Sequence, residues 1–96
     1  MEYVALVIYD IRDDKLRLEV ARFLKRTGLT RIQKSAFAGL VKPSDRANIE
    51  AGIRRVTRGW SNYNVQIYFI TPAAYSQRIV MSEGYSLEEE EDEFLI

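Results

Sequence analysis

The segment VALVIYDIRDD at residues 4–14 constrains the fold most, because a nearly continuous apolar run changes there abruptly into charge. Tyr3 to Tyr9 is rich in β-branched and aromatic residues, which is typical of a central strand covered on at least one face. Asp10 follows this strand directly. It either ends the strand in an ordinary turn or holds a carboxylate on a rigid sheet edge, where the carboxylate can do chemistry.

An amphipathic helix is predicted after the strand. From Asp14 to Thr27 the apolar residues recur with a period of about 3.6, while basic side chains lie on the other faces. Asp13 or Asp14 can cap the first turn, and Gly28 can end the helix. The residues predicted to face inward are Leu16, Val20, Phe23 and Leu24.

The middle of the chain is predicted to be extended. Thr30 to Val41 shows partial alternation of apolar and polar residues. Within it, Gly39 and the polar pair Gln33 and Lys34 indicate a bulge, a bend or a break into two short strands.

A second helix is predicted from Asp45 to Arg58, with Ile49, Ile53 and Val56 facing inward. Gly52 lies on the same face, where the missing side chain permits a close approach of backbones. Val65 to Ile70 predicts another strand, and Ser76 to Met81 is compatible with a last short one.

This order of elements predicts an α+β fold of the split βαβ type, an antiparallel sheet with two helices on one face. The predicted domain covers residues 1–82, and residues 83–96 are expected to form a flexible acidic tail. The open face of such a sheet needs a cover, and a second copy of the chain is the simplest one.

Two residue types are absent, and their absence excludes whole classes of mechanism. The 96-residue chain contains neither cysteine nor histidine. This excludes disulfides, thiol nucleophiles, Cys/His zinc sites and the Ser-His-Asp triad. Carboxylates, lysine, tyrosine, hydroxyl groups or a hard metal ion bound through oxygen remain for catalysis. Without an apolar run of about 20 residues or an export signal, we expect a cytoplasmic protein that does not contact membranes.

The formal net charge of zero hides an uneven distribution. Six of the 14 acidic residues form the run Glu88 to Glu93, so residues 1–87 carry 14 basic and 8 acidic side chains, a balance of +6. A basic body with an acidic tail is typical of polyanion binding, with a tail that competes with the ligand or simply keeps the chain in solution.

Three motifs together resemble a known family. They are a strand that ends in Tyr-Asp-Ile, the segment GLTRIQKSAFAG, and the Val-x-Ile-Tyr pattern at residues 65–68. In order and spacing the chain is similar, over about residues 1–80, to the small CRISPR-associated protein of the spacer-acquisition machinery, the second core family and partner of the integrase subunit. Ala36 stands where the family more often has valine, and the Glu88 to Glu93 run lies outside the pattern.

The resemblance implies a ferredoxin-like homodimer in which the end of each chain extends the partner's sheet, a role that Ser76 to Met81 suits. It implies a metal-dependent endonuclease that acts on single-stranded RNA or on duplex DNA, and a scaffold that holds the integrase subunits and spacer DNA. Asp10 matches the catalytic, metal-binding aspartate of the family. One Asp10 from each protomer would hold Mg²⁺, or Mn²⁺ in its place.

Nucleic-acid binding is predicted for residues around these motifs. Arg12, Lys15, Arg17, Arg31 and Lys34 can hold phosphates, although a solvated charged face explains any one of them as well. Phe37 can stack on a base or fill the core, and Tyr9 can pack or direct its hydroxyl to a phosphate. Asp13 and Asp14 are better explained as helix caps than as metal ligands. The predicted nucleic-acid-binding residues are Tyr9, Arg12, Arg17, Arg31, Lys34, Ser35 and Phe37.

Two other functions stay open. One is an architectural DNA-binding dimer that scaffolds the integrase subunits without cutting, and the other is a toxin-type ribonuclease of related fold. An RNA-binding domain of the RNP type is excluded, because its aromatic signature is missing from the predicted strands. The sequence does not decide between RNA and DNA.

Overall fold

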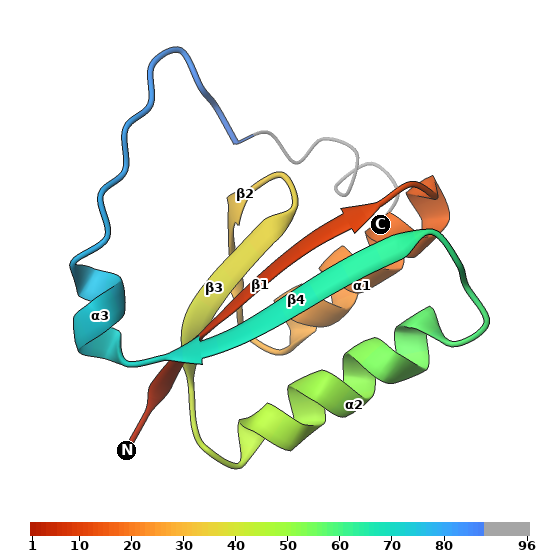
Figure 1. Ribbon diagram of the computed structural model, residues 1–96, viewed down its shortest axis with the longest axis horizontal. Helices are drawn as coiled ribbons and strands as arrows, with labels where there is room; N and C mark the ends of the chain where they lie inside the picture. Colours follow the sequence, from red (N-terminus) through yellow and green to blue (C-terminus); the bar gives the residue numbers. More distant parts are fainter. Residues whose placement is uncertain (88–96) are drawn as a thin grey trace.

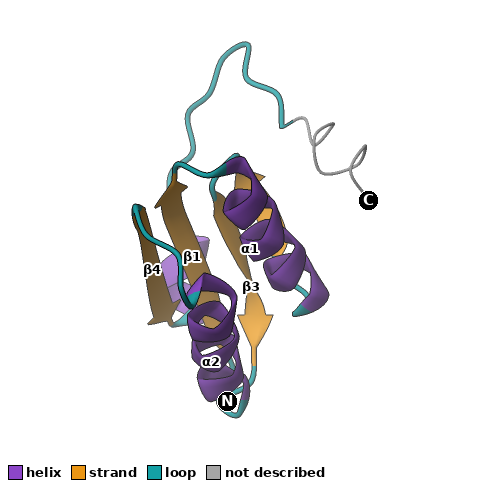
Figure 2. Ribbon diagram, turned by 90° about the vertical axis from the view of Figure 1, so that its right-hand side faces the viewer, coloured by secondary structure: helices purple, strands orange, loops and turns teal. Residues whose placement is uncertain are grey.

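The computed structural model describes residues 1–87 and places two long helices on one face of a four-stranded sheet (Figures 1 and 2). A short third helix follows the last strand. In chain order the elements are β1 (Tyr3–Ile11), α1 (Asp14–Arg26), β2 (Thr30–Gln33), β3 (Ala36–Val41), α2 (Asp45–Thr57), β4 (Tyr63–Ile70) and α3 (Pro72–Ser76).

The sheet is antiparallel throughout, with the strand order β2-β3-β1-β4. This confirms the predicted α+β fold and the central position of the first strand. Thr30 to Val41 is broken into two strands by a turn at Lys34 and Ser35, and the β2–β3 register shifts between Arg31 and Gln33. Among the described strands, β2 and β4 form the two edges of the sheet.

The hydrophobic core lies between the sheet and the two long helices. Alternate residues of β1, which are Ala5, Val7, Tyr9 and Ile11, are buried on this side. They pack with the apolar face of α1, where Leu16, Val20 and Leu24 are fully buried, as the periodicity predicted.

Gly52 sets the distance between the two helices. A Cβ atom built on it would lie 2.0 Å from Cζ of Phe23, which is far inside the contact distance. The Phe23 ring of α1 therefore packs directly on the backbone of α2, and the predicted close approach at Gly52 is confirmed.

The two long helices each end one residue earlier than predicted, and three other segments differ more. β1 continues through Asp10 to Ile11, because β4 begins already at Tyr63 and pairs with it over this length. Ser76 is the last residue of α3 and does not begin a strand. Thr71 caps this helix, since its Oγ1 accepts a hydrogen bond from the backbone N–H of Ala74 (3.1 Å). Residues 77–81 form neither helix nor strand, and they are not part of the hydrogen-bonded sheet, although Val80 and Met81 line a pocket with Ile32 and Gln33 of β2. The strand predicted over Ser76–Met81 is therefore not formed within the single chain.

The face of the sheet opposite α1 and α2, called the open face below, carries the other alternate residues of β1, including Leu6, Ile8 and Asp10. None of the helices in the described part of the chain is long and apolar enough to span a membrane. The Glu88 to Glu93 run lies outside the described residues.

Candidate metal and nucleic-acid site

Asp10 is the exposed residue between two buried neighbours of β1. Tyr9 and Ile11 belong to the core, so the Asp10 carboxylate points to the open face. Within the described residues it has neither a hydrogen-bond partner nor an ion-pair partner. The strand therefore holds Asp10 on a rigid backbone and leaves its carboxylate available to a ligand.

The turn between β2 and β3 lies at the same end of the sheet as Asp10. The backbone N–H of Tyr9 donates to the carbonyl oxygen of Ser35 (2.9 Å), and the Tyr9 hydroxyl donates to the carbonyl oxygen of Lys34 (3.4 Å). These bonds bring the predicted residues Lys34 and Ser35 next to the end of β1.

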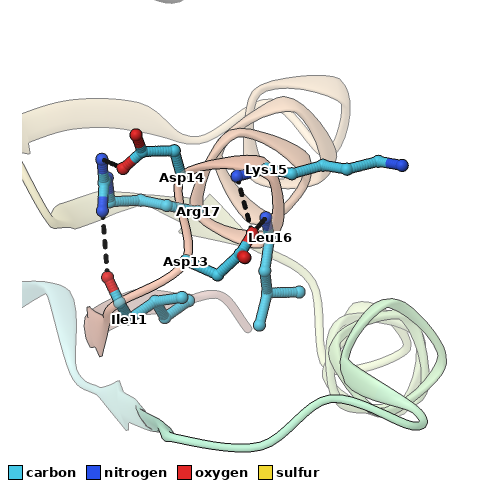
Figure 3. Close-up of polar contacts among 6 residues, drawn as sticks. All are labelled: Ile11, Asp13, Asp14, Lys15, Leu16 and Arg17. Atoms are coloured by element: carbon cyan, nitrogen blue, oxygen red, sulfur yellow. Dashed lines mark hydrogen bonds and ion pairs between the residues drawn. The ribbon is translucent and has the colours of Figure 1, made fainter.

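The connection from β1 to α1 is fixed by two residues (Figure 3). The Asp13 carboxylate caps α1 by accepting from the backbone N–H groups of Lys15 (2.8 Å) and Leu16 (3.0 Å). Arg17 donates from Nη1 to the carbonyl oxygen of Ile11 (3.0 Å) and forms an ion pair with Asp14. Capping by Asp13 is confirmed, and Arg17 holds the strand end that carries Asp10.

Two of the predicted nucleic-acid-binding residues lie inside the protein. Phe37 is 0% exposed, and Tyr9 belongs to the same core cluster and stacks near it with 6.3 Å between ring centroids. The burial of these rings, which face the helices, favours the core-packing alternative for both residues over a direct contact with nucleic acid. The Arg31 guanidinium lies 5.1 Å from the Phe37 ring centroid, so Arg31 is held over the core as well.

Asn64 is a site residue that the sequence analysis missed. It lies on β4 directly opposite Asp10, and side chains that face one another in an antiparallel pair share one face of the sheet. The strand was expected to begin only at Val65, so the pairing of Asn64 with Asp10 was not visible in the sequence. The structure therefore places the carboxylate of Asp10 beside the carboxamide of Asn64 on the open face. The exposed Arg12 follows two residues after Asp10.

The Asp10 carboxylate is the type of ligand that Mg²⁺ prefers, but a single chain offers few such ligands at this place. The described residues contain no group of three or more His, Cys, Asp or Glu side chains that could hold a metal ion. Mg²⁺ commonly takes one or two protein carboxylates and keeps several of its waters. Asp10 meets this requirement minimally in one chain, and a second copy would supply a second carboxylate.

The comparisons with known proteins agree on one family. The family model described as "CRISPR associated protein Cas2" matches residues 1–78. A protein of Korarchaeum cryptofilum named "CRISPR-associated endoribonuclease Cas2" is 54% identical over 57 residues, which are 59% of this chain and 61% of that protein. A second relative, "CRISPR-associated endoribonuclease Cas2 2" of Pyrobaculum aerophilum, is 35% identical over 74 residues, 77% of this chain and 80% of the relative.

A fusion protein and a solved structure extend the comparison. A Thermoproteus tenax protein named "CRISPR-associated endonuclease Cas1/endonuclease Cas2 fusion" is 35% identical over 63 residues, 66% of this chain and 24% of the fusion. The structure titled "Crystal structure of cas2" superposes with a TM-score of 0.70 at 22% identity, covering 92% of this chain and 97% of that one. At this identity the structural match supports the fold alone.

Proposed function

The chain belongs to the family of CRISPR associated protein Cas2, and from this membership we propose that it is a metal-dependent endonuclease that hydrolyses phosphodiester bonds. The observation that carries the proposal is the exposed Asp10 carboxylate, which is fixed within β1 and has no partner among the described residues. Two relatives are named endoribonucleases, so RNA is the first substrate to test and duplex DNA the second.

Asp10 would hold Mg²⁺, or Mn²⁺ in its place, through its carboxylate oxygens. When bound, the ion supplies charge compensation at the phosphate and activates water for attack. Arg12 and Lys34 are exposed beside this end of the sheet and attract the phosphate backbone without regard to sequence. Arg17 contributes by holding the carbonyl oxygen of Ile11, which keeps the strand end in place.

We expect cleavage of single-stranded RNA to require the metal. A 5′-labelled RNA and a duplex DNA are incubated with the purified protein over a Mg²⁺ titration, with an EDTA arm. Cleavage that rises to saturation with Mg²⁺ and stops in EDTA supports the proposal, because a carboxylate alone does not activate water at phosphate. Cleavage that is unchanged in EDTA contradicts it.

The assembly proposed for this enzyme is a homodimer. β4 is an edge strand with unpaired backbone groups, and the segment Ile79–Met81 exposes three large apolar side chains after α3. In a dimer this segment would add a strand to the partner's β4 and cover its own apolar side chains there. The dimer would also bring a second Asp10 to the site.

The proposed dimer should dissociate when a single negative charge is introduced into the segment Ile79–Met81. Val80→Asp should shift the protein from dimer to monomer in sedimentation velocity, because the carboxylate would have to be buried without a partner. Ser82→Asp adds the same charge at a neighbouring exposed polar position and should leave the dimer intact. A wild-type protein that is monomeric over the whole concentration range, or two variants that behave alike, contradicts this assembly.

An architectural role is the second function. The Cas1/Cas2 fusion protein supports a Cas1-type integrase subunit as partner, since fusion places the two proteins in one complex by covalent linkage. Reversing the charge of Arg12 and Lys34 together should weaken nucleic-acid binding and therefore harm both functions. Loss of the Asp10 carboxylate should harm cleavage alone, which separates the enzyme from the scaffold.

A further inference from the structure

The described part of the chain ends beside β2, the edge strand that packs against α1. After α3 the chain turns at Gly84, whose backbone is left-handed (φ 68°). Tyr85 and Leu87 then line a pocket of about 530 Å³ together with Ile32 and Gln33 of β2. Leu87 is the last described residue, so residues 88–96 start from this edge of the molecule.

The outer face of α1 combines positive charge with one apolar side chain. Leu18 lies about 200° around the helix from the fully buried Leu16, so it points away from the core. Leu18, Arg22 and Lys25 are spaced i, i+4 and i+7 and share one side of the helix, and we call these three residues the α1 stripe. The whole of α1 carries five basic and two acidic residues, and one of the two, Asp14, is paired with Arg17.

The residues that follow the described chain have the complementary composition. Glu88 to Glu93 carry six negative charges, and the apolar sequence Phe-Leu-Ile at residues 94–96 comes directly after them. We propose that this C-terminal segment, residues 88–96, docks on the α1 stripe of its own chain. The acidic run lies at the two cations of the stripe, and the apolar end covers its leucine.

The α1 stripe is within reach of the segment. An α-helix with its side chains is about 10–12 Å across, whereas six extended residues span about 20 Å and nine span about 30 Å. A segment that starts beside β2 can therefore pass around α1 to its outer face. This face belongs to neither the open face of the sheet nor the β4 edge, which the proposed dimer uses.

Docking competes with the dimer proposed above. In the single chain Val80 and Met81 line the pocket beside β2, whereas the dimer needs them at β4 of the partner. The two positions exclude one another, so a C-terminal segment docked on its own chain keeps that chain monomeric. This consequence rests on the assembly proposed for the enzyme, while the docking itself does not.

The absence of cysteine from the chain permits a direct test by disulfide trapping. In the full-length protein Leu18→Cys is combined with Leu95→Cys, and disulfide formation under a mild oxidant is followed on non-reducing gels. The control pair is Ala47→Cys with Leu95→Cys, because Ala47 is exposed on α2. We expect the first pair to form an intramolecular disulfide about tenfold faster than the control pair, and this difference to shrink in about 1 M salt.

Charge reversal tests the two cations of the α1 stripe. Arg22→Glu with Lys25→Glu should slow the trapping to the rate of the control pair. It should also raise the affinity of the dimer about tenfold or more in sedimentation velocity, because more chains are then competent to dimerise. The matched control is Arg55→Glu with Arg58→Glu, which makes the same charge change with the same spacing at the end of α2 and should behave like wild type.

A second variant leaves α1 unchanged. When the six acidic residues from Glu88 to Glu93 are changed to their amides, trapping should slow and dimer affinity should rise as in the α1 variant. Circular dichroism and thermal melting establish that each variant is folded.

The proposal is overturned if both cysteine pairs react at the same rate or if the disulfide forms only between two chains, which would assign the segment to a second copy. It is also overturned if the α1 and α2 charge variants behave alike. A protein that forms the intramolecular disulfide but stays monomeric in every variant refutes the proposed dimer and retains the docking.

Discussion

Gly52→Ala is expected to lower the free energy of unfolding by about 2 kcal/mol, although alanine favours helices more than glycine by about 1 kcal/mol. The added Cβ atom would lie 2.0, 2.3 and 2.8 Å from three atoms of the Phe23 ring. The ring is packed between α1 and α2, so the helices must separate or Phe23 must leave its position. For a domain of this size the melting temperature should fall by roughly 10 °C.

The measurement is urea or thermal unfolding followed by circular dichroism. Ala51→Gly changes the neighbouring exposed position of α2 and reports helix propensity alone, with an expected loss of about 1 kcal/mol. The double variant Gly52→Ala with Phe23→Leu should be more stable than the sum of the two single changes predicts, because the smaller side chain makes room for the methyl group. A Gly52→Ala protein that is more stable than wild type contradicts this account of the helix contact.

Asp10→Asn is expected to reduce metal-dependent cleavage by about 100-fold or more, because the amide is neutral and holds a divalent cation poorly. The Asp10 side chain is exposed and has no hydrogen-bond or ion-pair partner among the described residues, so the free energy of unfolding should change by less than about 0.5 kcal/mol. Nucleic-acid binding in EDTA should be retained or slightly stronger, since one negative charge is removed.

Asp14→Asn is the matched control for this variant. Asp14 lies four residues away, its side chain is 89% exposed, and its conversion to asparagine changes the charge by the same amount. Its ion pair with Arg17 lies on the surface and contributes little to stability. Equal activity of the Asp10→Asn and wild-type proteins, or equal loss in both variants, would leave Asp10 without a catalytic role.

The fold could be predicted because its main signals are local. The period of α1 identified the buried Leu16, Val20 and Leu24, and the glycine on the inner face of α2 indicated the close helix contact. The short helix α3, which the sequence analysis did not predict, also has a local signal. Thr71 caps it and Pro72 takes the first helical position, a combination that is typical of a helix start.

The site could be predicted only in part, because strand register is not local. Asp10 was identified from its place after an apolar run, and its availability depends on the alternation that buries Tyr9 and Ile11. The partner across the sheet, Asn64, depends on where β4 begins and pairs, which no short segment specifies. The same alternation directs Phe37 into the core, which is one of the two positions that the sequence allowed for it.

Direct measurement of metal binding tests the central claim that Asp10 holds the divalent cation. Mn²⁺ is titrated into the wild-type, Asp10→Asn and Asp14→Asn proteins, and free Mn²⁺ is measured by electron paramagnetic resonance. The account predicts saturable binding by wild type and Asp14→Asn, and loss of that binding in Asp10→Asn. Saturable binding that survives in Asp10→Asn would place the metal elsewhere and contradict the account.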